Sequence, residues 1–140
     1  MGTIKIERLF DAPVEYVWKA LTEYELMKQW YFDLPYFKAV KGHDFRFYGG
    51  PSPERQYLHV CTVLDVIENK KLSYSWRYEG YAGNSVVTFE LEAKGENTLL
   101  RFSHSGLESF PADNADLASS NFEIGWNHII NTALLNFINK

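Results

Sequence analysis

The stretch ADLASSNFEIGWNHIINTALLNFIN, residues 115–139, decides the fold because its apolar residues recur at the spacing of one long amphipathic helix. At about 1.5 Å per residue, this helix would be about 37 Å long, enough to cross a small domain. One broad apolar stripe is predicted to contain Ala118, Phe122, Trp126, Ile129, Ile130, Ala133 and Phe137, and a second apolar edge Leu117, Ile124 and Leu135. The rest of the chain must therefore cover this helix from more than one side.

Gly125 lies in the middle of this predicted helix, beside Trp126. A glycine at such a position is about 1 kcal/mol less favourable than alanine, so it calls for a reason. Close packing against a neighbouring element is the favoured interpretation. The alternative is that Gly125 forms part of a pocket wall.

Length and composition favour one domain over residues 1–140. The chain has 140 residues, of which 46% are hydrophobic, and two domains would each be close to the lower size limit for an independent core. Aromatic residues make up 16%, with 10 Phe, 9 Tyr and 4 Trp. Large flat side chains can line a cavity as well as fill a core, and composition does not separate the two.

Charge and targeting signals exclude several classes of partner. The net charge is −4 and no Lys/Arg run is present, which argues against nucleic acid and against a membrane surface as partners. No apolar run is long enough to insert into a membrane, and the N-terminus lacks the apolar core of a signal peptide, so a cytoplasmic location is expected. The single cysteine, Cys61, cannot form an internal disulfide and is predicted to be a small buried residue.

The order of predicted elements is β-αα-β5-α. A strand over residues 3–10 precedes a helix that starts near Pro13 and a second short helix over residues 24–30. The period then changes from about 3.6 to 2, and turn residues divide the segment into five strands. These strands are predicted at residues 44–48, 57–67, 72–79, 85–93 and 98–105, with a loop at residues 49–53. An α+β fold follows, with helices on one face of an antiparallel meander.

Several short motifs, taken in this order, resemble a known family. They are WKALT at residues 18–22, QWY at 29–31, LSYSW at 72–76, TFELE at 88–92, HSG at 104–106 and GW at 125–126. The chain resembles the SRPBCC or START-like superfamily, of the birch-pollen-allergen fold, and within it the branch similar to the activator of the heat-shock-protein-90 ATPase. The resemblance covers essentially the whole chain.

The resemblance implies a helix-grip fold, in which a curved antiparallel sheet wraps around the long C-terminal helix. It also implies an internal cavity between the sheet, that helix and the two short helices. Similar members bind hydrophobic small molecules, and some relatives are polyketide cyclases or aromatases. The family has no shared catalytic signature that could be carried over to residues of this chain, and fold alone does not select a function.

The sequence contains no portable enzyme motif and no metal-ligand spacing. Walker, dinucleotide-glycine, HExxH, CxxC and G-x-S-x-G patterns are all missing. His43, His59, His104 and His128 are scattered through predicted strands and a helix. We therefore expect no metal, no cofactor and no assignable catalytic residue, and an enzyme is the less favoured hypothesis.

His104 is the most informative histidine because strand alternation places it with Leu100 and Phe102, on the face predicted to look toward the cavity. An imidazole there could hydrogen-bond a ligand or act as an acid or base. The favoured alternative is a histidine near the strand end that is bonded to backbone or water.

The predicted cavity lining consists of large aromatic side chains on the inward faces of the strands and helices, together with this histidine. These residues are Trp30, Phe45, Phe47, Trp76, Tyr78, Phe89, Phe102, His104 and Trp126. The alternative is that they simply fill the core, and at least half of them are expected to do so.

Three functional hypotheses follow. The leading one is binding of a small hydrophobic or aromatic molecule in the cavity, with His104 or a tyrosine hydroxyl fixing its orientation. The second is a cyclase- or aromatase-like enzyme that uses the same cavity. The third is a chaperone-interacting module that works through its outer surface. A homodimer is also open, through the sheet or the aromatic segment over residues 31–37.

Overall fold

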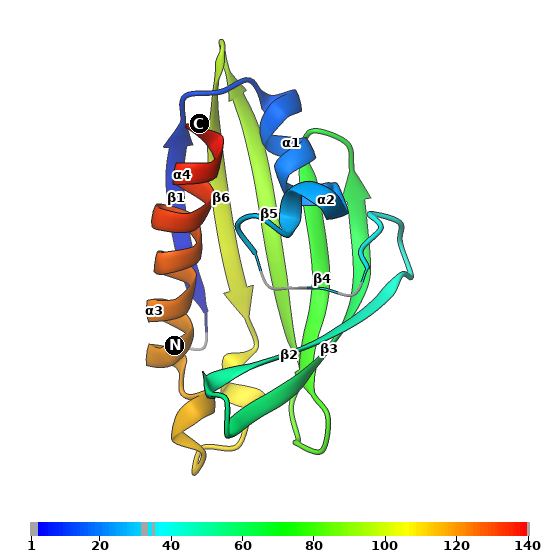
Figure 1. Cartoon of the computed structure of the whole chain (residues 1–140), viewed down its shortest axis with the longest axis vertical. Coiled ribbons are helices and arrows are strands. Elements are labelled where there is room, and N and C mark those ends of the chain that lie inside the picture. The colour runs from blue at the N-terminus through cyan, green and yellow to red at the C-terminus, as the bar shows by residue number, and fades with distance from the viewer. Residues whose placement is uncertain (1–2, 32–33, 35, 140) are drawn as a thin grey trace.

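A six-stranded antiparallel sheet holds a long C-terminal helix and two short helices on one of its faces (Figure 1). The computed structural model describes residues 3–31, 34 and 36–139. The strands lie in the order β1-β6-β5-β4-β3-β2, so β2 to β6 form a meander and β1 pairs beside β6. The predicted element order and the α+β helix-grip fold are confirmed.

The strands alternate between buried and exposed side chains, which is why each can present one face to the core. In β2, Phe45 and Phe47 are buried while Tyr48 is 68% exposed. The same alternation buries Leu100, Phe102 and His104 in β6. The strands are β1 (Ile4–Phe10), β2 (Asp44–Ser52), β3 (Arg55–Ile67), β4 (Lys71–Tyr78), β5 (Ser85–Lys94) and β6 (Asn97–Ser105).

Two short helices cover one end of the sheet. Helix α1 (Val14–Thr22) buries Val17, Trp18 and Leu21, and α2 (Tyr24–Met27) buries Met27. Helix α2 is shorter than the predicted helix over residues 24–30. Trp30, which follows it, is nevertheless held inward because its Nε1 donates a hydrogen bond to the carbonyl of Ala20 at 2.9 Å.

The C-terminal helix begins later than predicted. Residues Ala115–Leu117 form a separate 3-10 turn, η2, where the Asn114 side chain accepts a hydrogen bond from the Asp116 amide at 3.0 Å. The helix proper consists of α3 (Ser119–His128), the π-helical stretch η3 (Ile129–Leu134) and α4 (Leu135–Ile138).

This start corrects the predicted apolar stripe. Ala118 has an extended backbone and is exposed, and Ile124 is 70% exposed because it lies on the side of α3 that faces solvent. The buried side of the helix instead continues through Leu134 and Ile138, which are almost completely buried.

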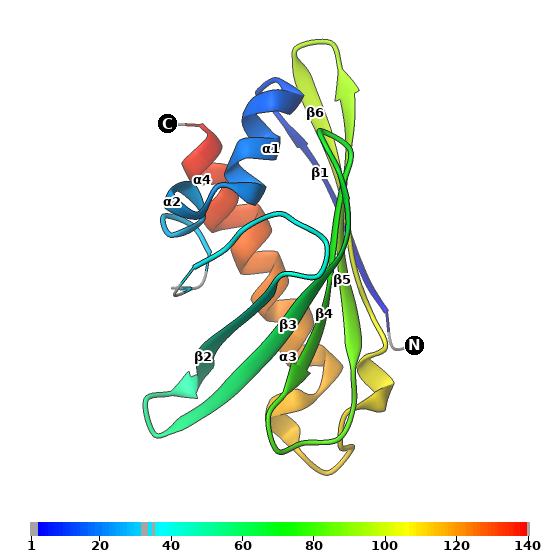
Figure 2. The same cartoon turned by 90° about the vertical axis from the view of Figure 1, so that its right-hand side faces the viewer.

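The β2–β3 hairpin bends out of the sheet toward α3 (Figure 2). Register shifts between Gly49 and Ser52 and between Val63 and Asp65 mark bulges, which bend strands. The predicted loop at residues 49–53 is replaced by a longer β2, which continues to Ser52. Gly50 permits this close pairing, because a Cβ at that position would lie 1.8 Å from the Arg55 carbonyl oxygen.

The prediction that Cys61 is a small buried residue is confirmed. Cys61 is completely buried in β3, and burial raises the pKa of its thiol, so the thiol stays protonated and packs as a small apolar group. Among the helices of the described residues, none combines the length and the hydropathy needed to span a membrane.

Candidate functional site

A cavity of about 390 Å³ lies between the β2–β3 hairpin, β4 and the first half of the C-terminal helix. The sheet side contributes strand residues, and the helix side contributes residues of η2, α3 and η3. The lining residues are Gly49, Gly50, Tyr57, His59, Trp76, Tyr78, Asp116, Leu117, Asn121, Phe122, Ile124, Gly125, Trp126 and Ile129. The hairpin and the helix, which lie far apart in the sequence, thus form opposite walls.

The cavity has a buried aromatic floor and an exposed rim. Trp76, Tyr78 and Trp126 are at most 4% exposed, whereas Asn121 and Ile124 on α3 are exposed. The cavity therefore opens to solvent along α3 and narrows toward tightly packed rings. The Trp76 and Trp126 ring centroids are 5.5 Å apart at the bottom.

The cavity occupies one end of the space between sheet and helix, and the other end is filled. The predicted position included the two short helices, but α1 and α2 contribute no residue to the lining. Large buried side chains pack at their end of the molecule: Phe10, Leu21, Met27, Trp30, Leu34 and Phe37.

The structure brings three of the nine predicted lining residues to the cavity: Trp76, Tyr78 and Trp126. The other six are buried in the packed core that surrounds it, where ring contacts occupy their faces. Phe102 packs on Trp126 with centroids 4.5 Å apart, and Phe47 stacks on His59 at 4.4 Å. These six are Trp30, Phe45, Phe47, Phe89, Phe102 and His104.

His104 is the centre of a buried hydrogen-bond chain that links the helix to three strands. The Trp126 indole Nε1 donates to His104 Nδ1 at 2.9 Å, so this ring nitrogen carries no proton. His104 Nε2 therefore carries the proton and donates to Ser85 Oγ at 2.7 Å. The Ser85 hydroxyl in turn donates to the carbonyl of Trp76 at 2.9 Å.

This chain fixes the protonation state of His104 and the orientation of Trp126. Burial lowers the pKa of His104 from 6.5 to about 3, so the ring is neutral at physiological pH. Both ring nitrogens are already engaged by protein groups. His104 thus acts on the cavity indirectly, by holding the indole that forms its floor.

Tyr78 offers a hydrogen-bond donor at the cavity. Its hydroxyl oxygen accepts a hydrogen bond from Trp76 Nε1 at 2.9 Å, and it makes no other hydrogen bond with the described residues. Burial raises the pKa of this hydroxyl well above its ordinary value of 10, so the proton stays on the oxygen. A ligand oxygen or nitrogen that reaches this hydroxyl can accept a hydrogen bond from it.

The polar groups near the rim are already paired. Asp116 receives a hydrogen bond from the Tyr57 hydroxyl at 2.6 Å and forms an ion pair with Arg55 at 2.8 Å. His59 lies deeper, where burial lowers its pKa to about 4, and its Nδ1 donates to the Tyr57 carbonyl at 2.9 Å. Among the described residues that line the cavity, none carries a positive charge at neutral pH.

Gly125 forms part of the helix wall of the cavity. A Cβ built on this residue would have no heavy atom within 4 Å, apart from its chain neighbours and the backbone of its own helix. Close packing, the favoured interpretation of this glycine from the sequence, is therefore wrong. The space in front of Gly125 belongs to the cavity.

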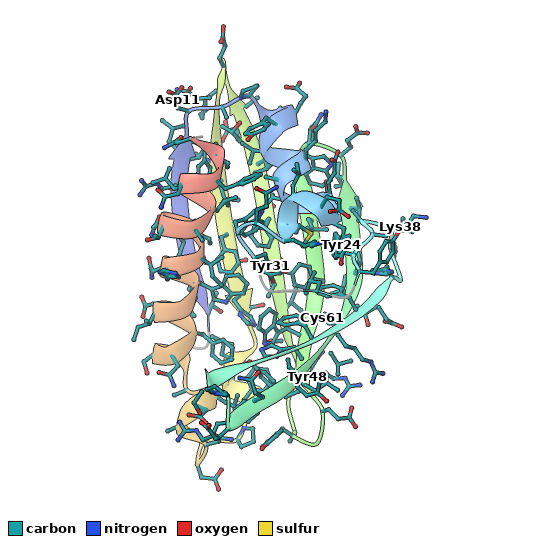
Figure 3. The ribbon with its side chains drawn as sticks, in the orientation of Figure 1. Asp11, Tyr24, Tyr31, Lys38, Tyr48 and Cys61 are labelled. Carbon is teal, nitrogen blue, oxygen red and sulfur yellow. The ribbon has the colours of Figure 1, made fainter. Side chains whose placement is uncertain are left out.

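A buried pair of tyrosines, Tyr31 and Tyr74, lies beside Trp126. The hydroxyls of Tyr31 and Tyr74 are hydrogen-bonded to each other, and burial raises the pKa of both. The Tyr31 ring stacks on Trp126 with centroids 6.2 Å apart. Figure 3 shows Tyr31 between the C-terminal helix and the sheet.

Several residues that line the cavity were not predicted from the sequence. Phe122 and Ile129 were assigned to the apolar stripe of the helix, and this stripe was the signal that could have placed them at the cavity. Tyr57, Asp116 and Asn121 meet only through tertiary structure, because the hairpin must bend before β3 approaches η2. No local pattern in the sequence encodes this approach.

The described residues offer no metal site, since no group of three His, Cys, Asp or Glu side chains comes together in residues 3–31, 34 and 36–139. Most residues that line the cavity are apolar or aromatic, and few of them are polar.

Comparison with known proteins gives one family and several solved structures. The family model described as Activator of Hsp90 ATPase homolog 1-like protein matches residues 11–136. Protein MLL2253 from Mesorhizobium loti is 29% identical, with a TM-score of 0.78, over 98% of this chain and 96% of that one. Protein BH1534 from Bacillus halodurans is 28% identical, with a TM-score of 0.75, over 99% and 97%.

The fold is also shared by less similar sequences. Protein CV1439 from Chromobacterium violaceum is 17% identical, with a TM-score of 0.83, over 99% of this chain and 98% of that one. No curated protein matches the chain.

Proposed function

The chain belongs to the Activator of Hsp90 ATPase homolog 1-like protein family, and from this premise we propose that it binds a small, uncharged hydrophobic or aromatic molecule. The proposed site is the cavity between the β2–β3 hairpin, β4 and α3. Within it, Trp76, Tyr78 and Trp126 are proposed to contact the ligand.

The observation that carries this proposal is a concave, solvent-accessible cavity whose floor is formed by buried aromatic side chains. Small-molecule sites are mostly concave and lined by hydrophobic and aromatic side chains with a few polar groups. A cavity of about 390 Å³ falls within the range of about 300–1,000 Å³ typical of small-molecule sites. Such a space in water favours an apolar occupant.

The size of the expected binding energy follows from the area that a ligand would bury. A two-ring aromatic molecule of indole size buries on the order of 200 Å² of apolar surface, worth about 5 kcal/mol at about 25 cal/mol per Å². This energy is an upper bound on what apolar burial contributes, because association also costs the ligand's translational and rotational freedom, so it does not convert directly into a dissociation constant. A larger ligand with a well-placed acceptor would bind more tightly.

The polar groups of the lining favour an uncharged ligand with a hydrogen-bond acceptor. Tyr78 can donate its hydroxyl proton, whereas His59 is neutral. Asp116 is the charged residue of the lining, and Tyr57 and Arg55 already hold its carboxylate. Among the described lining residues none is cationic, because Arg55 pairs with Asp116 from outside the lining, so nothing there favours an anionic ligand.

Catalysis by His104 is not part of the proposal. An acid or base must reach the proton that it transfers, and both His104 nitrogens are engaged by Trp126 and Ser85. Binding is therefore a better match to this geometry than cyclase-like proton transfer.

Native mass spectrometry of protein purified from its own cells tests the proposal. The control is the same chain unfolded, freed of small molecules and refolded. We expect the purified protein to carry an additional mass at one copy per chain, released on unfolding and missing from the control. Identical masses for the two samples would contradict the proposal, and co-purification with a chaperone would favour the protein-interaction hypothesis instead.

A further inference from the structure

The helix face that lines the cavity carries large apolar residues with one gap. Phe122, Trp126 and Ile129 lie three or four residues apart and therefore share one side of the helix, and all three line the cavity. Gly125 lies at the centre of this group, three residues after Phe122 and four before Ile129. The stripe is thus interrupted where it faces the hairpin.

The backbone does not require glycine at this position. Gly125 has an ordinary helical conformation and is not among the glycines with positive φ, so a side chain would cause no backbone strain. Its Cβ would meet no neighbouring atom within 4 Å. Gly50 is the contrast, because a Cβ there would collide with the Arg55 carbonyl oxygen.

Position 125 therefore holds a residue that weakens the helix, although alanine would fit there. The residue is half-buried and belongs to the cavity lining, and the described residues leave the space next to its backbone unfilled. What the glycine provides is room beside the helix backbone.

We propose that Gly125 is a specificity-determining residue that sets how large a ring system the cavity accepts. A ring of the ligand lies against the helix backbone at Gly125 and takes the place of the missing side chain between Phe122 and Ile129. This inference rests on the proposed ligand-binding function. The addition is an upper limit on the size of the ligand, which depends on the room that the missing side chain of Gly125 leaves.

The test uses two uncharged fluorescent probes of different size, 2-naphthol with two fused rings and 9-phenanthrol with three. Their affinities are measured for the wild type, Gly125→Ala and Gly125→Leu. We expect Gly125→Ala to weaken 9-phenanthrol about tenfold, the effect of forcing a methyl group into occupied space, and to affect 2-naphthol less. Gly125→Leu should abolish binding of 9-phenanthrol.

The matched control is Thr132→Ala. Thr132 is exposed on the same helix, lies outside the cavity lining, and also gains helix propensity when replaced by alanine. Its replacement should leave both affinities unchanged. Gly125→Ala should raise the melting temperature by about 4 °C, because alanine favours the helix and nothing collides with it.

The outcomes separate this inference from the function on which it rests. Equal affinities of the wild type and Gly125→Ala for both probes would overturn the role of Gly125 and leave ligand binding standing. A lower melting temperature of Gly125→Ala would overturn it as well, by showing that the fold needs the glycine. Failure of the wild type to bind either probe would contradict the proposed function and the inference together.

Discussion

Individual buried polar residues show how burial decides which groups can act on a ligand. His104 and Tyr78 both lie in the interior, but His104 uses both ring nitrogens within the protein, while Tyr78 retains a donor proton. Burial keeps both residues uncharged at neutral pH because a charged form would lose its hydration. Tyr78 is thus a hydrogen-bond donor of the cavity lining, and His104 positions Trp126.

The first residue-scale prediction is that Tyr78→Phe weakens binding of 2-naphthol by about three- to tenfold, the value of one hydrogen bond. The cavity keeps its shape because phenylalanine retains the ring. The melting temperature should also fall, since Trp76 Nε1 loses its acceptor. Tyr48→Phe is the control, because Tyr48 is 68% exposed on the outer face of β2, and it should change neither quantity. Unchanged affinity of Tyr78→Phe would remove Tyr78 from the site.

The second residue-scale prediction concerns how the free energy of unfolding depends on pH. His104 and His59 have pKa values lowered to about 3 and about 4, while in the unfolded chain both titrate near 6.5. As pH falls below 6.5, both histidines become protonated in the unfolded state but stay neutral in the folded state. The free energy of unfolding is therefore highest above this pH and declines below it. Each histidine should contribute a slope of about 1.4 kcal/mol per pH unit between about pH 6 and pH 4.5.

Urea unfolding at several pH values measures this slope. In His104→Leu the slope should fall by about half, and stability at neutral pH should drop by about 1–3 kcal/mol because Trp126 Nε1 loses its partner. A free energy of unfolding that stays constant down to pH 4.5 would show that these rings are protonated in the folded state.

For individual residues, the sequence predicts which face of a strand a side chain lies on better than it predicts which residues that side chain contacts. Strand alternation correctly placed His104 on the inward face with Leu100 and Phe102. The partners of its ring, Trp126 and Ser85, lie 22 and 19 residues away in sequence on other elements. No local spacing could identify them, because they meet only after the helix docks on the sheet.

At the scale of secondary structure, the C-terminal helix and the β2–β3 hairpin determine the cavity. The periodicity of residues 115–139 predicted the helix and most of its buried stripe. It did not predict the break at Ala118, because apolar spacing continues through η2 although the backbone becomes extended there. Likewise, the Gly49–Gly50 pair indicated a loop, whereas it lies in a bulged strand that bends toward α3.

The element-scale prediction is that Gly50→Ala destabilises the protein by about 1–3 kcal/mol, since the new Cβ would lie 1.8 Å from the Arg55 carbonyl oxygen and the hairpin must open. The same change should weaken 2-naphthol, because the hairpin is one wall of the cavity. Chemical denaturation and probe titration measure both effects. Glu54→Ala, at an exposed position in the same turn, should change stability by less than about 0.5 kcal/mol. Equal stability of the two variants would contradict this account of the hairpin.

At the scale of the whole molecule, the residues between the sheet and the C-terminal helix are packed at one end and line a cavity at the other. The end beside α1 and α2 is packed with Trp30, Leu21 and Phe37, while the end beside the hairpin stays open. The order of elements in the sequence predicted an α+β fold, and the resemblance to a known family implied the helix grip. The sequence could not predict which end is open, because that depends on how residues distant in sequence pack together.

The central claim is that a small molecule enters the cavity, and the indole N–H signals of the four tryptophans test it most directly. Trp76 and Trp126 line the cavity, whereas Trp18 and Trp30 do not, so the protein contains its own control. In a ¹⁵N-labelled sample titrated with 2-naphthol, we expect the Trp76 and Trp126 signals to shift with a common saturation curve while those of Trp18 and Trp30 stay in place. Equal shifts of all four signals, or no shift of any at saturating probe, would contradict binding in this cavity.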